Sequence, residues 1–183
     1  MRYVALFRGI NVGKAKRIAM ADLRALLTRL GFKDVATLLN SGNAVFTAPG
    51  EPDGGLDARI RAAVAKQLGV DASVIVKSEK DIAAAIQGNE LGTVAADPSR
   101  LLIAFTADAK SLATVKSIAA ADWGAEQVRV GKHAAYLWCA NGILESKAAV
   151  ALFRGLGNEG TTRNWATLTK IHALMQGGGR DER

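Results

Sequence analysis

The sequence predicts an α+β protein of two ferredoxin-like subdomains (βαββαβ and βαββαα), with mainly antiparallel sheets and with helices on one face. Two observations lead to this prediction. Strand-like and helix-like hydrophobic patterns follow the order β-α-β-β-α-β through roughly the first 77 residues, which is the order of a ferredoxin-like unit. The same order begins again after a breaker-rich connection at 88–99 and ends as β-α-β-β-α-α. A chain of 183 residues, 49% of them hydrophobic, is long enough for two such cores.

The first half begins with a short apolar strand at 2–7, and a loop that contains glycine follows at 9–17. A helix comes next, because leucines recur at i, i+3, i+4 and i+7 from Leu23 to Leu30. Gly31 directly follows the last leucine and ends this helix.

A hairpin is predicted from strands at 35–39 and 44–48, joined by the tight turn Asn-Ser-Gly-Asn at 40–43. Apolar residues then recur every fourth position through 56–68, which predicts a second helix, and a strand follows at 73–76. These elements complete the first subdomain.

Ser78 and Asp81 form a capping box that opens a short linking helix. The predicted domains are therefore 1–88 and 99–176, followed by a polar tail at 177–183 that is expected to be mobile. The predicted elements of the second domain are a strand at 101–105, a helix capped by Asp108, a hairpin of 127–130 and 135–139, and helices at 146–154 and 164–176. Residues 155–160 are predicted to be a glycine-rich link that replaces the final strand.

Four stretches resemble a known set in the same order: LFRGINVG at 6–13, the helix at 20–30 with Gly31 and Phe32, SGNAVF at 41–46, and GTTRNW at 160–165. They resemble the bacterial family called domain of unknown function 1697, over essentially the whole chain. The resemblance implies a cytoplasmic protein of two ferredoxin-like subdomains. It implies no catalytic residues.

Several functional classes are disfavoured by composition. No stretch reaches the roughly 18 uninterrupted apolar residues of a membrane helix, so a cytoplasmic protein without a membrane partner is expected. The single cysteine, Cys139, excludes an intramolecular disulfide and is expected to fill the core. His133 and His172 lie too far apart for the usual zinc spacing, and neither has an identifiable catalytic partner. No metal and no cofactor are expected.

Positive charge is concentrated at the N-terminal end of the chain. The formal net charge is +7, and residues 1–50 alone hold 8 Lys and Arg against 2 Asp and Glu. Arg8, Lys14, Lys16 and Arg17 fall within ten residues that contain no acid. Such a segment attracts anions, whether nucleic acid, phosphorylated metabolites or acidic protein surfaces. The alternative is a surface loop whose charge serves only solubility.

The loop at 9–15 lies between a strand and a helix, where backbone N–H groups can bind phosphate. It is not a Walker A loop, since three residues separate Gly9 from Gly13 and Ala15 follows Lys14. We predict a simpler anion site, although a purely structural turn would also require these glycines. The predicted ligand-binding residues are Arg8, Gly9, Asn11, Gly13 and Lys14, supported by Ser41, Asn43 and Arg163.

Arg163 enters this prediction because the segment at 161–165 is expected to begin the last helix. An arginine there could provide a second anion contact at the positive end of the helix dipole. The alternative is a helix cap next to an arginine that is paired with an acid.

Three further hypotheses concern function. RNA recognition by base stacking is disfavoured, because Asn43 and Val45 occupy the positions where aromatic residues are needed. Phe7 and Phe46 are expected in the core. Binding to the nucleic-acid backbone stays open. Acylphosphatases share the β-α-β-β-α-β order, and by that analogy Arg8 or Arg17 could bind phosphate and Asn40 could position water, although a glutamine-bearing loop is absent. A protein-interaction module is the third alternative. A non-catalytic binder of an anionic ligand is favoured.

Overall fold

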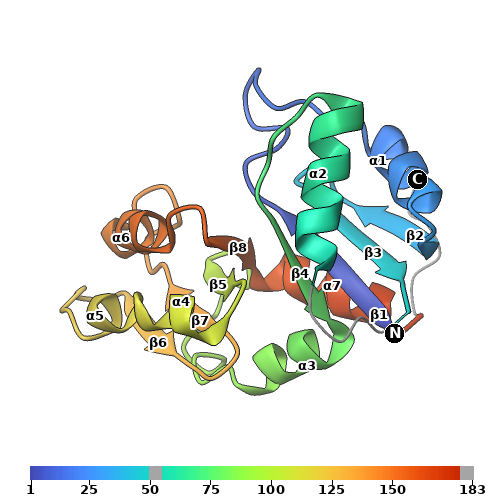
Figure 1. Ribbon diagram of the computed structural model, residues 1–183. Coiled ribbons are helices and arrows are strands. Elements are labelled where there is room, and N and C mark those ends of the chain that lie inside the picture. Colours follow the sequence, from blue (N-terminus) through green and yellow to red (C-terminus); the bar gives the residue numbers. More distant parts are fainter. Residues whose placement is uncertain (50–54, 178–183) are drawn as a thin grey trace. The chain divides into compact units, whose positions relative to one another are not determined.

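The computed structural model describes residues 1–49 and 55–177 and contains two compact units (Figure 1). Unit 1 comprises residues 1–80 and the segment that begins at Ile171, and unit 2 comprises residues 81–170. Each unit contains one four-stranded antiparallel sheet with helices. The predicted α+β fold class is confirmed.

Unit 1 has the predicted element order. Its elements are β1 (Arg2–Phe7), α1 (Met20–Arg29), β2 (Lys33–Leu38), β3 (Asn43–Thr47), α2 (Leu56–Leu68) and β4 (Val74–Ser78). The strand order across its sheet is β2-β3-β1-β4. The leucines that predicted α1 include Leu23, Leu26 and Leu27, all of which are buried. Gly69 ends α2 in the left-handed conformation that glycine adopts without strain.

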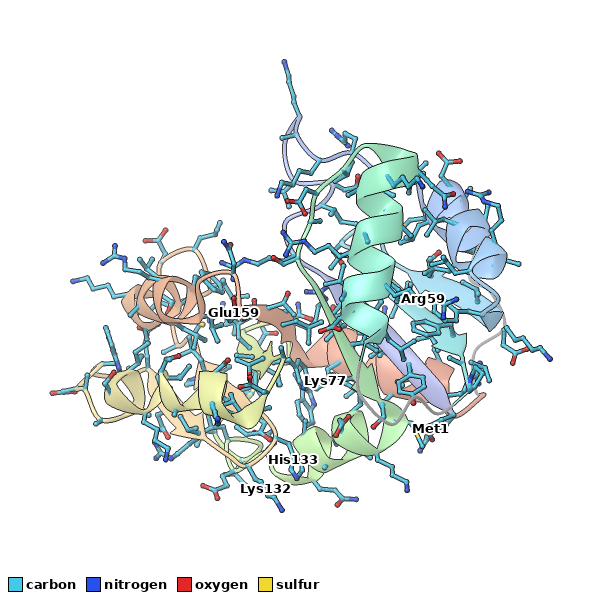
Figure 2. The ribbon with its side chains drawn as sticks, viewed as in Figure 1. Met1, Arg59, Lys77, Lys132, His133 and Glu159 are labelled. Atoms are coloured by element: carbon cyan, nitrogen blue, oxygen red, sulfur yellow. The ribbon has the colours of Figure 1, made fainter. Side chains whose placement is uncertain are left out.

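The core of unit 1 lies between its sheet and the helices α1 and α2. Phe7 and Phe46 are fully buried, which confirms that both are core residues. The Phe46 ring stacks on Phe32 with a centroid distance of 4.5 Å and on Tyr3 with a centroid distance of 5.9 Å. The guanidinium of Arg59 lies 5.1 Å from the centroid of the Phe32 ring and covers this aromatic cluster from outside (Figure 2).

Unit 2 repeats the topology of unit 1. The remaining elements of the chain are α3 (Glu79–Gln87), β5 (Leu101–Thr106), α4 (Ala109–Ala113), α5 (Lys116–Ala119), β6 (Gln127–Val130), β7 (Ala135–Trp138), α6 (Lys147–Leu156), β8 (Gly160–Asn164) and α7 (Trp165–Met175). The strand order of the second sheet is β6-β7-β5-β8, which corresponds strand for strand to the first.

The prediction that the second subdomain lacks a final strand is wrong. Residues 160–164 form β8, which pairs antiparallel with β5 along its whole length. The segment is polar and begins with glycine, so its hydrophobic pattern does not indicate a strand. Its β-branched residues Thr161 and Thr162 nevertheless favour extended backbone, and pairing with the buried β5 supplies the hydrogen bonds. Unit 2 is therefore a complete βαββαβ unit.

Two further boundaries differ from the prediction. The helix predicted through Val115 is divided into α4 and α5, although Asp108 caps it as expected, accepting a hydrogen bond of 2.8 Å from the Ser111 N–H. The unit boundaries fall after Lys80 and Lys170 rather than in the connection at 88–99. The predicted tail begins at Gly177, which has a φ of +84°, and the rest of the tail lies outside the described residues.

Tyr136 organises part of the interior of unit 2. Its side chain is buried, and its hydroxyl donates a hydrogen bond of 2.7 Å to the Ala85 carbonyl. Burial raises the pKa of Tyr136 to about 12, because the phenolate would lose its hydration. Gly88 and Gly131 leave room for the ring, since a Cβ at either position would come within 3.1 Å of a Tyr136 atom.

None of the helices in residues 1–49 and 55–177 has an apolar stretch of the length that crossing a membrane requires.

Candidate functional site

The connection between β1 and α1 is much longer than the fold requires. It spans residues 8–19, whereas the equivalent connection in unit 2, between β5 and α4, consists only of Ala107 and Asp108. Because both crossovers have the same topology, two residues are enough to join such a strand to its helix. The additional residues form a loop that extends beyond the sheet, coloured dark blue in Figure 1. Loops of about twelve residues or more without secondary structure of their own are uncommon in compact domains, and they are usually either functional or linker segments.

Asn11 fixes the shape of this loop. Its φ of +57° lies in the left-handed region, and its backbone N–H donates to the Lys16 carbonyl at 3.0 Å. Its side-chain Nδ2 donates to the carbonyls of Ile18 and Asn40, each at 2.8 Å, and its Oδ1 accepts from the Ile18 N–H at 2.9 Å. The Asn11 side-chain amide, which we predicted to bind ligand, is therefore hydrogen-bonded to other residues of the protein.

The end of β1, directly before the loop, is joined to the turn of the neighbouring hairpin. The Phe7 N–H donates to the Gly42 carbonyl at 2.9 Å. In the hairpin, Asn43 is fully buried, and its Nδ2 donates to the Leu38 carbonyl at 2.8 Å and to Ser41 Oγ at 3.2 Å. Ser41 and Asn43, both predicted as supporting ligand residues, thus stabilise the hairpin turn. Their contribution to the site is to hold the turn at 39–42 beside the loop.

An open pocket of about 300 Å³ lies where the loop meets α1. Its lining residues are Asn11, Arg17, Ile18, Ala19, Met20 and Asn40. Ala19 is the N-cap residue of α1 and has no side chain that could accept a hydrogen bond from the helix. The first intrahelical acceptor is the Ala19 carbonyl, which bonds to the Leu23 N–H. The N–H groups of the first turn, which precede Leu23, therefore have no acceptor within the helix itself.

The loop presents positive charge to solvent. Lys14, Lys16 and Arg17 are exposed, and side chains that end in nitrogen project from this segment in Figure 2. Within residues 1–49 and 55–177, the side chains of Lys14 and Arg17 form no hydrogen bond and no ion pair. These two cations are therefore available to an anionic ligand.

The carboxylate of Asp71 lies in the electrostatic range of Lys16 but does not cancel the charge of the loop. Two hydrogen bonds from Arg61, at 2.8 and 3.1 Å, are the main cause of the lowered pKa of Asp71, and the charge of Lys16 contributes least. Arg61 is thus the principal counter-ion of Asp71. The positive potential around Lys14, Lys16 and Arg17 persists.

The predicted site and the observed pocket overlap only in part. Arg8, Gly9, Gly13 and Lys14 lie in the loop as predicted, and the space around both glycines is open, so their role is to adopt φ values of +65° and +62°. Arg17 and Asn40 line the pocket together; the sequence indicated Arg17 as part of the basic segment, whereas it suggested Asn40 only by analogy with a hydrolase. Met20, a further pocket residue, was missed. The sequence did contain one indication of a pocket at the start of α1: no residue able to cap the helix precedes Met20, although the helix is clearly periodic.

A model of a protein family described as "Protein of unknown function (DUF1697)" matches residues 1–136. The chain belongs to the DUF1697 family. The match confirms the resemblance over residues 1–136, which include the whole β1–α1 loop. The chain is also similar to the solved structure of the conserved bacterial protein SP0830 from Streptococcus pneumoniae, with 26% identity and a TM-score of 0.77 over 95% of this chain and 98% of that chain. No curated protein matches the chain.

The predicted role of Arg163 at a helix start is wrong for this DUF1697 protein. Arg163 lies in β8 opposite Ile103 and is only 8% exposed. Its Nη1 donates to Thr161 Oγ1 at 3.0 Å and to the Thr162 carbonyl at 2.7 Å, and burial lowers its pKa to about 10. Because the Arg163 side chain is buried and hydrogen-bonded to residues of β8, it does not provide an exposed anion contact.

Cys139 does not resemble a nucleophile in this DUF1697 protein. Its side chain is fully buried, as expected, and burial raises the pKa of its thiol. Because the thiolate is the reactive form of cysteine, this environment keeps Cys139 unreactive near neutral pH.

Proposed function

We propose that this DUF1697 protein is a cytoplasmic, non-catalytic binder of an anionic, phosphate-bearing ligand, and that the ligand binds at the loop of residues 8–19. The observation that carries the proposal is the internal comparison between the two units. The same crossover takes two residues in unit 2 and twelve in unit 1, and the longer connection holds four cations and no acid. Neither the fold nor solubility requires so long a basic loop at one crossover only.

The pocket beside the loop supports phosphate as the bound group. The guanidinium of Arg17 can donate two parallel hydrogen bonds to phosphate oxygens, and the backbone amides at the start of α1 can donate others. Nucleic acid is included among the candidates through its backbone alone. Phe7 and Phe46 are buried in the core and offer no platform on which bases could stack.

Removing Lys14 and Arg17, two exposed cations of the loop, is expected to abolish stabilisation by ligand. We expect one class among nucleotides, phosphorylated metabolites and short DNA or RNA to raise the melting temperature, since a ligand at one hundred times its Kd stabilises by about 2.7 kcal/mol. The doubly substituted variant Lys14→Ala/Arg17→Ala should lose this shift, because both side chains are exposed and free within the described residues. Thermal melting with each ligand measures the effect.

The matched control removes charge from the same unit but away from the loop. Lys66 is exposed in α2, so Lys66→Ala lowers the net charge by one without touching the pocket. We expect this variant to keep the ligand-induced shift. A shift that survives in Lys14→Ala/Arg17→Ala would contradict the proposed site. The absence of a shift with every ligand would contradict the proposed function and favour the protein-interaction alternative.

A second candidate function is hydrolysis of an acyl phosphate or a phosphoester. The specific observation in its favour is that Arg17 and Asn40 line one pocket, so a cation for the phosphate and an amide for a water molecule are brought together. Asn40 is exposed, and its carbonyl already accepts a hydrogen bond from Asn11, which fixes its backbone.

Hydrolysis makes a separate prediction about Asn40. If the protein turns over an acyl phosphate, Asn40→Ala is expected to lower kcat by roughly 100-fold, the effect of losing a group that orients water. Release of inorganic phosphate is the measurement, and the Lys66→Ala variant should retain the rate. Equal rates in Asn40→Ala and the unaltered protein would remove this candidate.

A further inference from the structure

We infer that the tip of the β1–α1 loop, residues 12–15, inserts its apolar side chains into the surface of an anionic lipid bilayer, while the cations of the loop bind the phosphates of the lipid headgroups. This inference rests on the proposed function and names the partner of the same loop. Soluble phosphate compounds bind the same cations, but without the apolar contact of the tip. Three features of the loop support a bilayer as the partner: its protrusion, its exposed apolar side chains and its cations.

The tip protrudes because a hydrogen bond closes the loop at its base. The Asn11 N–H donates to the Lys16 carbonyl at 3.0 Å, so residues 12–15 lie beyond a closed base. All residues from 12 to 17 are exposed, and the loop extends away from the sheet in Figure 1. Within the described part of the chain, no atom beyond its two chain neighbours lies within 4 Å of a Cβ built on Gly13. The tip is therefore free to contact a flat partner.

The tip exposes apolar side chains. Val12 is 70% exposed, and Ala15 is exposed as well. Leu39 is 51% exposed and precedes Asn40, whose carbonyl accepts the hydrogen bond of 2.8 Å from the Asn11 side chain. A single exposed apolar residue is common on protein surfaces, but here one hydrogen bond joins two loops that each expose one. This end of unit 1 therefore offers apolar contact as well as charge.

Cations flank the apolar tip. Lys14 lies within it, Lys16 and Arg17 follow it directly, all three are exposed, and residues 8–19 contain no acid. Each such cation gains roughly fivefold in affinity near a bilayer that contains anionic lipids. Positive charge and apolar contact together hold a protein on a membrane surface, whereas either signal alone binds it weakly. A nucleic-acid backbone would contact the cations but leave Val12 in water. An anionic bilayer is thus the phosphate-bearing partner that uses both features of the loop.

The expectation that the chain has no membrane partner concerned a different mode of binding. It was based on the length of apolar stretches, which decides whether a helix can cross a bilayer. A loop that binds at the bilayer surface needs no such stretch, because only a few side chains enter the headgroup region.

Co-sedimentation of the protein with lipid vesicles tests the inference. Vesicles made of equal parts of phosphatidylcholine and phosphatidylglycerol should bind the protein. Vesicles of phosphatidylcholine alone should bind it roughly 10-fold less or weaker still, because their surface has no net negative charge. Raising the salt concentration from about 0.1 M to about 1 M should also weaken binding to the anionic vesicles, since the Debye length falls from about 10 Å to about 3 Å.

Two variants separate the apolar contact from the charge. Val12→Ser keeps every cation and should weaken binding to the anionic vesicles roughly fivefold, because the valine side chain no longer moves from water into the bilayer. It should leave unchanged any shift in melting temperature that soluble phosphate compounds cause, whereas Lys14→Ala/Arg17→Ala should abolish both effects. The matched control is Val150→Ser, which removes a valine that is 54% exposed in α6 of unit 2. This control should bind the vesicles as the unaltered protein does.

The possible results distinguish the membrane partner from the proposed function. If the anionic vesicles do not bind but a soluble ligand still raises the melting temperature, the membrane partner is overturned and the proposed function stands. Equal binding of the anionic vesicles by Val12→Ser and the unaltered protein would mean that charge alone holds the loop, and it would likewise overturn the inference. Neither vesicle binding nor a shift with any soluble ligand would overturn both.

Discussion

Replacing Gly42 by alanine is expected to lower the free energy of unfolding by about 3 kcal/mol. Gly42 has a φ of +86°, where a residue with a side chain is strained by roughly 1–2 kcal/mol. A Cβ at this position would also lie 2.7 Å from Phe7 Cβ and 2.7 Å from Ile10 Cδ1. Both neighbours are buried and cannot move away freely, so overpacking adds roughly 1–3 kcal/mol. Thermal melting should show a decrease of roughly 6–12 °C.

Gly31→Ala is the matched control for this experiment. Gly31 has a similar φ of +88°, but within the described part of the chain no atom beyond its two chain neighbours lies within 4 Å of a Cβ built on it. The control therefore contains the backbone strain without the overpacking, and we expect a loss of about 1 kcal/mol. Equal losses in the two variants would contradict the packing described around Phe7 and Ile10. The comparison thus tests whether the turn at 39–42 is held tightly against the start of the loop.

Elements that depend on local patterns could be predicted from the sequence. The leucines of α1 and the glycine that ends α2 predicted where both helices lie, because hydrophobic periodicity and a left-handed helix cap depend on residues only a few positions apart. Strand β8 escaped prediction for the opposite reason. Its residues Thr161 and Thr162 become a strand through pairing with Phe105 and Ala104, more than 50 residues earlier in the chain. A local pattern carries no information on such a partner.

The candidate site, too, could be predicted from local sequence patterns only in part. The cations and glycines of the loop are visible in the sequence, and so is its place between a strand and a helix. The role of Asn11 is not visible, because its side-chain partners are Ile18 and Asn40, which lie 7 and 29 residues away. Asn40 enters the pocket for the same reason, since the hydrogen bond with Asn11 joins two loops that are distant in the chain. The loop could therefore be predicted from the sequence, whereas the hydrogen bonds that join it to the hairpin turn could not.

Substitution of Asn11 is expected to have the second large effect, because one side chain holds the loop in place. Asn11→Gly keeps access to the φ of +57° but removes the three side-chain hydrogen bonds to Ile18 and Asn40. At roughly 0.5–1.5 kcal/mol for each bond, the loss is about 2 kcal/mol. Asn11→Ala removes the same bonds and adds strain at positive φ, so we expect a loss of about 3 kcal/mol. Urea unfolding of both variants measures the difference.

Asn11→Asp changes the hydrogen bonds that the side chain can form but keeps its size. A carboxylate could still accept from the Ile18 N–H, but it would turn an oxygen toward the carbonyls of Ile18 and Asn40, where the amide now donates. We expect this variant to be less stable than Asn11→Gly and to lose hydrogen-exchange protection at the Ile18 amide. Protection at Leu27, in the middle of the buried face of α1, should fall much less, because the helix core does not depend on Asn11. Unchanged exchange at Ile18 in Asn11→Asp would mean that the loop is held by other contacts.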